Sequence, residues 1–142
     1  DKAIKNAKKV AMSLSDKFCV DRHKPHFLDL VKNKLDIIFA NEEEILSLID
    51  TRNLDDVITF GKEIGKILVV TRGKHGAISI NKGKVTKINI NKGLEVIDLT
   101  GAGDLFAAGY LHGHINNFSE EKCLQNGTDM SSKIIQKIGA RL

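Results

Sequence analysis

Aromatic residues are scarce in this sequence, which has no tryptophan and is only 5% aromatic. Its basic residues therefore form no stripe interleaved with aromatics, which argues against a nucleic-acid-binding surface. The net charge is +4, but the lysines and arginines are dispersed among the acids, as on a solvated surface. No apolar run approaches the ~20 residues that cross a bilayer. The 42% hydrophobic content is typical of a globular protein.

Several chemistry-bearing motifs are also missing. Cys19 and Cys123 are far apart and form no C-x-x-C pair, so we expect no zinc site or structural disulfide and a reducing, cytoplasmic setting. The five histidines contain no H-E-x-x-H pattern. No G-x-x-x-x-G-K-[ST] loop occurs, and Phe106 stands where a dinucleotide fingerprint requires a third glycine. Ser13 and Ser15 have neither a nearby histidine nor a nucleophile elbow.

Short apolar runs alternate along the chain with helical patterns. We expect strands over residues 10–14, 36–40, 67–71, 77–80 and 85–90. We expect helices over residues 1–9, 26–34, 41–48, 54–65, 103–114 and from 119 toward 137. This alternation, with one hairpin near the middle, predicts an α/β fold whose mostly parallel sheet has helices on both faces.

The run from Val96 to Gly109 carries the strongest functional signal. It leads from an apolar strand end through the small residues Gly101, Ala102 and Gly103 into a helix. Small residues leave the backbone amides uncovered, and unpaired amides and the helix dipole favour an anion at that place. A carboxylate, Asp104, stands at the same spot. This placement suggests a general base for a hydroxyl that attacks a phosphoryl group.

Polar residues follow the other predicted strands, and ligands gather at the carboxyl ends of strands in open α/β sheets. Asn41 and Glu44 are spaced to share one face of a first helical turn. A capping box, without any ligand, is the alternative interpretation of this pair. Thr71, Gly73 and Gly76 form a loop whose glycines allow close approach of a ligand, and an ordinary hairpin turn is the alternative there.

The segment from Asp98 to Ala108 resembles the C-terminal signature of the ribokinase (PfkB) family of small-molecule kinases, written D-T-T-G-A-G-D. The match covers Thr100 to Asp104 and departs at Leu99, where the family usually has threonine or another small residue. The resemblance implies that Gly101, Ala102 and Gly103 form an anion hole for the transferred phosphoryl group. It also implies that Asp104 deprotonates the acceptor hydroxyl.

The resemblance extends to the residues that would handle the nucleotide. Asn41 and Glu44 match the N-x-x-E motif, which in the family organises Mg²⁺ and phosphate, often through water. The resemblance implies that Thr71, Gly73 and Gly76 line the ATP site, and it makes Asn126 a neighbour of the adenine. In some relatives the counterpart of Asp98 helps to hold a monovalent cation, and a structural hydrogen bond is the plainer interpretation of Asp98 here.

The segments 14–23 and 138–141 look most like the adenosine-kinase-like branch, which also contains sugar kinases. Family members are about twice as long, and their N-terminal half carries the sugar-contacting residues and a lid. The resemblance therefore implies that residues 1–142 are the C-terminal ATP-binding and catalytic portion of a three-layer ribokinase-like domain. We expect this portion alone to be inactive.

The resemblance implies a sugar or nucleoside as the small-molecule partner, with no role for nucleic acid or a membrane. Family dimers often pair through the lid, so the sequence leaves both the acceptor and a homodimer open. A non-catalytic nucleotide-binding or interaction module is the alternative function.

Overall fold

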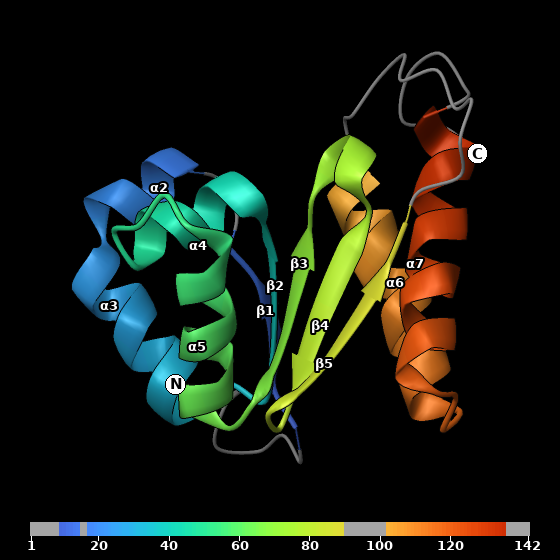
Figure 1. Ribbon diagram of the computed structural model, residues 1–142, viewed down its shortest axis with the longest axis horizontal. Helices are drawn as coiled ribbons and strands as arrows, with labels where there is room; N and C mark the ends of the chain where they lie inside the picture. The colour runs from blue at the N-terminus through green and yellow to red at the C-terminus, as the bar shows by residue number, and fades with distance from the viewer. Residues whose placement is uncertain (1–8, 15–16, 90–101, 136–142) are drawn as a thin grey trace. The chain divides into compact units, whose positions relative to one another are not determined.

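The computed structural model describes residues 9–14, 17–89 and 102–135 (Figure 1). The helix expected over residues 1–9 and the strand end at residues 96–97 lie outside these ranges. The chain divides into two compact units, Asp1–Val70 with Ser79–Val85 and Thr71–Ile78 with Thr86–Leu142. The first unit holds most of the strand residues, and the second holds the last two described helices.

The described strands form a five-stranded sheet whose order follows the chain. They are β1 (Ala11–Ser13), β2 (Ile37–Asn41), β3 (Ile67–Thr71), β4 (Ala77–Asn81) and β5 (Lys84–Ile88). β1 and β2 are parallel, with Ala11 opposite Ile37 and Ser13 opposite Phe39. β3 and β4 run in opposite directions (Figure 1), so the sheet is mixed. The α/β class predicted from the sequence is confirmed.

The middle strands are the most buried part of the sheet. The first four residues of β2, β3 and β4 are all buried, and these runs contain no charged side chain. Such continuous apolar runs are typical of strands that are covered on both faces. β5 differs, because Lys84 and Lys87 are exposed while Ile88 is buried. The bounds predicted for the strand at residues 67–71 agree with those of β3.

Helices α2 (Lys17–Arg22), α3 (Lys24–Asp29), α4 (Glu42–Leu48) and α5 (Leu54–Ile64) lie on one side of β1–β3 in the first unit (Figure 1). Each of α2, α4 and α5 contributes buried apolar residues, among them Val20, Ile45 and Val57. α5 ends at Gly65, which adopts the left-handed conformation that terminates many helices. This unit therefore has the strand-then-helix organisation that the sequence pattern predicts.

The helix expected over residues 26–34 is divided in the structure. Pro25 lies in the first turn of α3, but Leu30–Lys34 form a π-helical turn. The amide of Leu35 donates to the carbonyl of Leu30 at 2.9 Å, which closes this wider turn. α2 was not predicted, because a helix of six residues is too short to show a clear apolar period.

The second unit contains two long helices, α6 (Ala102–Ile115) and α7 (Glu120–Ile135). They pack against each other through buried side chains that include Phe106, Tyr110 and Leu124. Ser119 caps α7 by accepting a hydrogen bond from the amide of Lys122 at 3.3 Å. The end predicted for this helix, near residue 137, lies outside the described residues. None of the helices, over the part of the chain that the structure describes, has the length and apolar character needed to cross a bilayer.

The turn between β3 and β4 depends on two glycines for different reasons. Gly73 opens the 3₁₀ turn Gly73–His75 with a φ of 53°, and a Cβ there would meet no atom within 4 Å. Gly76 has a φ of 88° and a ψ of −141°, and its Cβ would lie 2.0 Å from the carbonyl oxygen of Ile88. The amide of Arg72 donates to the carbonyl of Gly76 at 2.8 Å. Gly76 is therefore required by the backbone, whereas Gly73 is only favoured.

We predict that Gly76→Ala lowers the free energy of unfolding by about 3 kcal/mol or more, because both strain and overpacking oppose a side chain there. Gly73→Ala is the matched control and is expected to cost about 1 kcal/mol, since only its left-handed φ is unfavourable. Urea unfolding of both variants measures the difference. Equal losses would contradict the assignment.

Candidate active site

Asn41 and Glu44 lie where β2 passes into α4. The Oδ1 atom of Asn41 accepts a hydrogen bond from the amide of Glu44 at 2.8 Å. In return, Oε1 of Glu44 accepts from the amide of Asn41 at 2.9 Å. The hydrogen bonds of a capping box are therefore present, and a ligand-binding role for this pair stays a prediction. These bonds fix both side chains at the carboxyl end of β2, and Glu44 is held there with only 5% exposure.

Glu44 is the acid that the family resemblance assigns to Mg²⁺. The described residues include no group of three or more His, Cys, Asp or Glu side chains placed to hold a metal ion. Mg²⁺ usually retains several waters and binds one or two carboxylates together with substrate phosphates. The donor set fits a hydrated Mg²⁺ held largely by phosphate, and it does not fit an all-protein metal site.

The predicted nucleotide loop occupies the β3–β4 turn. Thr71 is the last residue of β3 and is half-buried, and Gly73 and Gly76 bracket the 3₁₀ turn as the sequence predicts. The close contact of Gly76 with β5 gives that glycine a structural reason, in agreement with the hairpin-turn alternative. The open space beside Gly73 leaves the backbone there uncovered by other heavy atoms. A ligand-binding role for Thr71 and Gly73 stays a prediction.

Asp104 lies in the first turn of α6, one residue after Gly103, and both residues are exposed. A carboxylate in a first turn is favourably placed with respect to the helix dipole. A Cβ at Gly103 would meet no atom within 4 Å, so the space beside it is open as well. Ala102 begins the helix, whereas Gly101 and Asp98 lie outside the described residues.

Asn126, the predicted adenine neighbour, is half-buried on α7. Its backbone carbonyl faces α6, because a Cβ built on Gly109 would lie 2.5 Å from that oxygen. The contact with α6 therefore involves the backbone of Asn126, and its contact with adenine stays a prediction. Of the predicted site residues, Asn41 and Glu44 belong to the first unit and the others to the second.

The second unit contains a buried polar pair that the sequence pattern does not predict. The hydroxyl of Tyr110, which is fully buried, donates to Oε2 of Glu120 at 2.7 Å. Burial raises the pKa of Tyr110, and the Glu120 carboxylate raises it further. Burial also raises the pKa of the Cys123 thiol, so both groups are uncharged at neutral pH. Tyr110 is the one tyrosine in the sequence, and this rarity is the only sequence signal that could have pointed to the pair.

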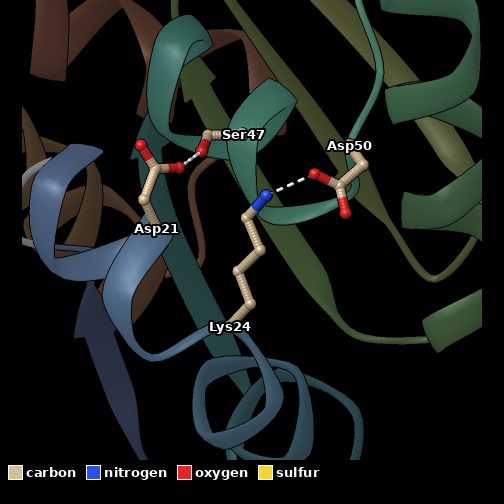
Figure 2. A network of polar contacts seen from close by, with 4 residues as sticks. All are labelled: Asp21, Lys24, Ser47 and Asp50. Carbon is tan, nitrogen blue, oxygen red and sulfur yellow. Dashed lines mark hydrogen bonds and ion pairs between the residues drawn. The ribbon is translucent and has the colours of Figure 1, made fainter.

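A network of polar contacts ties α4 to its neighbours, as Figure 2 shows. Ser47 of α4 donates to the carboxylate of Asp21 on α2. Lys24 at the start of α3 pairs with Asp50, which follows α4. These residues line a shallow depression of about 520 Å³. The Ser47–Asp21 hydrogen bond and the Lys24–Asp50 ion pair thus join α4 and the residue after it to α2 and α3, and they hold the helix that begins at the Asn41–Glu44 capping box.

The profile of the pfkB family carbohydrate kinases matches residues 1–142. A cytidine kinase from Thermococcus kodakarensis is 29% identical over 77% of this chain and 40% of its own length. An adenosine kinase from Dictyostelium discoideum is 29% identical over 97% of this chain and 44% of its own length. The chain therefore spans about two fifths of the length of these relatives.

Solved structures agree with the sequence comparisons. A probable sugar kinase from Rhizobium etli is 38% identical, with a TM-score of 0.90 over 96% of this chain and 42% of its own. An adenosine kinase from Sinorhizobium meliloti is 35% identical, with a TM-score of 0.89 over 94% of this chain and 41% of its own. The expected ribokinase-like α/β fold is confirmed by these similarities.

We predict that Asn41→Ala destabilises the protein by about 1–2 kcal/mol, because the amide of Glu44 loses its acceptor. Asn41→Ser is the matched control, since serine caps helices about as well as asparagine. Thermal or urea unfolding compares the two variants. If both are equally stable, the capping box does not contribute as described.

Proposed function

The chain belongs to the pfkB carbohydrate kinase family, and from this premise we propose that the complete protein transfers the γ-phosphoryl group of ATP to a hydroxyl of a sugar or nucleoside. The observation that carries the proposal is the exposed carboxylate of Asp104 in the first turn of α6. It directly follows the small residues Gly101, Ala102 and Gly103. A base and a set of uncovered amides are thus adjacent in one short segment.

In this reaction Asp104 accepts the proton of the acceptor hydroxyl. The hydroxyl oxygen forms a bond to the γ-phosphorus, and the bond from that phosphorus to the β,γ-bridging oxygen breaks. The first amides of a helix have no partner within the helix, so those of residues 102–104 are available to the phosphoryl oxygens. We assign Gly101, Ala102 and Gly103 to this anion hole.

The remaining predicted residues serve the nucleotide in this proposal. Glu44, fixed by Asn41, would hold a hydrated Mg²⁺, which would supply neutralisation of charge on the β- and γ-phosphates. Thr71, Gly73 and Gly76 contribute the loop beside the nucleotide. Asn126 lies near the adenine, and Asp98 remains the candidate for a monovalent cation.

The acceptor is proposed only as a class. Among the similar proteins are cytidine, adenosine and sugar kinases, whose names span nucleosides and carbohydrates. This chain spans about two fifths of their length, and we place the contacts that select the acceptor in the remaining part. Residues 1–142 alone should accordingly bind ATP without phosphorylating an acceptor. Adenosine, cytidine and ribose are the first acceptors to compare with the complete protein.

Asp104→Asn in the complete protein is expected to reduce kcat by about 10²- to 10⁴-fold, because the substituted amide cannot accept the hydroxyl proton. The KM for ATP should change little, since Asp104 acts on the acceptor. Asp55→Asn is the matched control, because Asp55 is likewise an exposed acid in a first helical turn. Steady-state kinetics with the best acceptor measures both variants.

Turnover of Asp104→Asn equal to that of Asp55→Asn would overturn Asp104 as the base. ATP binding without turnover on any acceptor, by the complete wild-type protein, would instead favour the non-catalytic nucleotide-binding module.

Glu44→Gln is expected to raise the Mg²⁺ concentration needed for half-maximal activity several-fold, because the carboxylate charge is lost. Stability should be nearly unchanged, since glutamine also completes a capping box. Glu43→Gln is the control, as Glu43 is exposed on the same turn. Mg²⁺ titration of activity and urea unfolding give the two readouts. An identical Mg²⁺ requirement in both variants would remove Glu44 from the metal site.

A further inference from the structure

The backbones of α6 and α7 touch at a crossing formed by two glycines. A Cβ on Gly127 of α7 would lie 2.8 Å from the carbonyl oxygen of Phe106 and 3.0 Å from its ring. A Cβ on Gly109 of α6 would lie 2.5 Å from the carbonyl oxygen of Asn126 and 2.9 Å from the Cα of Gly127. Backbone atoms and the Phe106 ring are the neighbours of the two glycines at this crossing, so the helices approach closely here.

On α6 the crossing begins at Phe106, within one helical turn of Asp104, and extends to Gly109, five residues beyond it. Phe106, whose carbonyl touches Gly127, is two residues beyond Asp104 in the same rigid helix. The Phe106 side chain is buried, with 3% exposure, so α6 is held here by both its backbone and its side chain. Displacement of the Phe106 peptide therefore displaces the turn that carries Asp104.

A second contact keeps the helices from sliding past one another. One turn after Phe106, the buried Tyr110 hydroxyl is bonded to Glu120 at the start of α7. This hydrogen bond fixes the register of the pair, while the glycines fix its separation. Close to Asp104, these contacts thus determine both the distance between α6 and α7 and the shift of one helix along the other.

We infer that Gly127 is a positioning residue for Asp104, an inference that rests on the proposed function. Gly127 acts through the Phe106 peptide, and its lack of a side chain sets how far the first turn of α6 lies from α7. A methyl group at residue 127 must push the Phe106 carbonyl from 2.8 Å to at least 3.4 Å, a shift of about 0.6 Å, to reach ordinary contact distance. Such a shift moves the base relative to its acceptor, and a misplacement of about 1 Å can cost 10²-fold in rate.

The test compares Gly127→Ala and Gly109→Ala in the complete protein with Gly113→Ala. Gly113 also faces α7, where its Cβ would lie 3.0 Å from Sγ of Cys123, but it is nine residues beyond Asp104. We expect kcat to fall about 10- to 100-fold for the two crossing variants and less than about 3-fold for Gly113→Ala. Far-UV circular dichroism and urea unfolding establish that each variant is folded.

A double-mutant cycle separates positioning from general damage to the fold. In the Asp104→Asn background, Gly127→Ala should change kcat by less than about 3-fold, because there is no carboxylate left to misplace. A merely structural role predicts the same fold-loss in both backgrounds, and that result would overturn the inference. If turnover of Asp104→Asn is too low to measure, a kcat for Gly127→Ala equal to that of Gly113→Ala overturns it instead.

The same experiment distinguishes the inference from the function on which it rests. Asp104→Asn with wild-type turnover would reject the general base, whatever the glycine variants do. A large loss in Asp104→Asn together with unchanged kcat in both crossing variants would leave the base in place and reject Gly127 as its positioning residue.

Discussion

The first amides of a helix have no partners within the helix, and this constraint bears on how α4, α5, α6 and α7 begin. α4 and α5 follow Asn41 and Asn53, and α7 follows Ser119, whose side chains accept from these amides. α6 follows Gly101, which has no side chain that could do so. In the proposed function, the oxygens of the phosphoryl group accept hydrogen bonds from the first amides of this helix. The requirement that stabilises α4 by a capping box would thus be met in α6 by substrate, beside Asp104.

The geometry around Asp104 depends on two features of α7, the missing side chain at Gly127 and the carboxylate of Glu120. Gly127 has no side chain and so lets α7 approach the carbonyl and ring of Phe106 closely, and the Tyr110–Glu120 bond prevents the helices from sliding. The two devices act in different directions, one across the helix pair and one along it. Gly127 lies outside the signature segment and can still affect the position of Asp104 within it. This is possible because a helix transmits a displacement over one turn with little loss.

The sequence was sufficient wherever the signal is local. The uncharged, β-branched run in β3 and the Asn41–Glu44 spacing predicted the strand and the capped helix, because neighbouring residues alone determine both. α2 and the π-helical turn at Leu30–Lys34 were missed, since six- and five-residue elements carry too little periodicity. The Tyr110–Glu120 bond and the Gly127 crossing were missed for another reason. Both depend on residues brought together by packing, which spacing along the chain does not encode.

The glycines of α6 also have an energetic consequence. Gly103, Gly109 and Gly113 occupy three of its positions, and each interior glycine disfavours an isolated helix by about 1 kcal/mol relative to alanine. α6 therefore has little tendency to persist without α7, whose close contact replaces the missing intrinsic preference. The two helices should then open and close as one cooperative unit rather than fray separately. The turn that carries Asp104 is ordered only as long as a different segment of the chain remains folded against it.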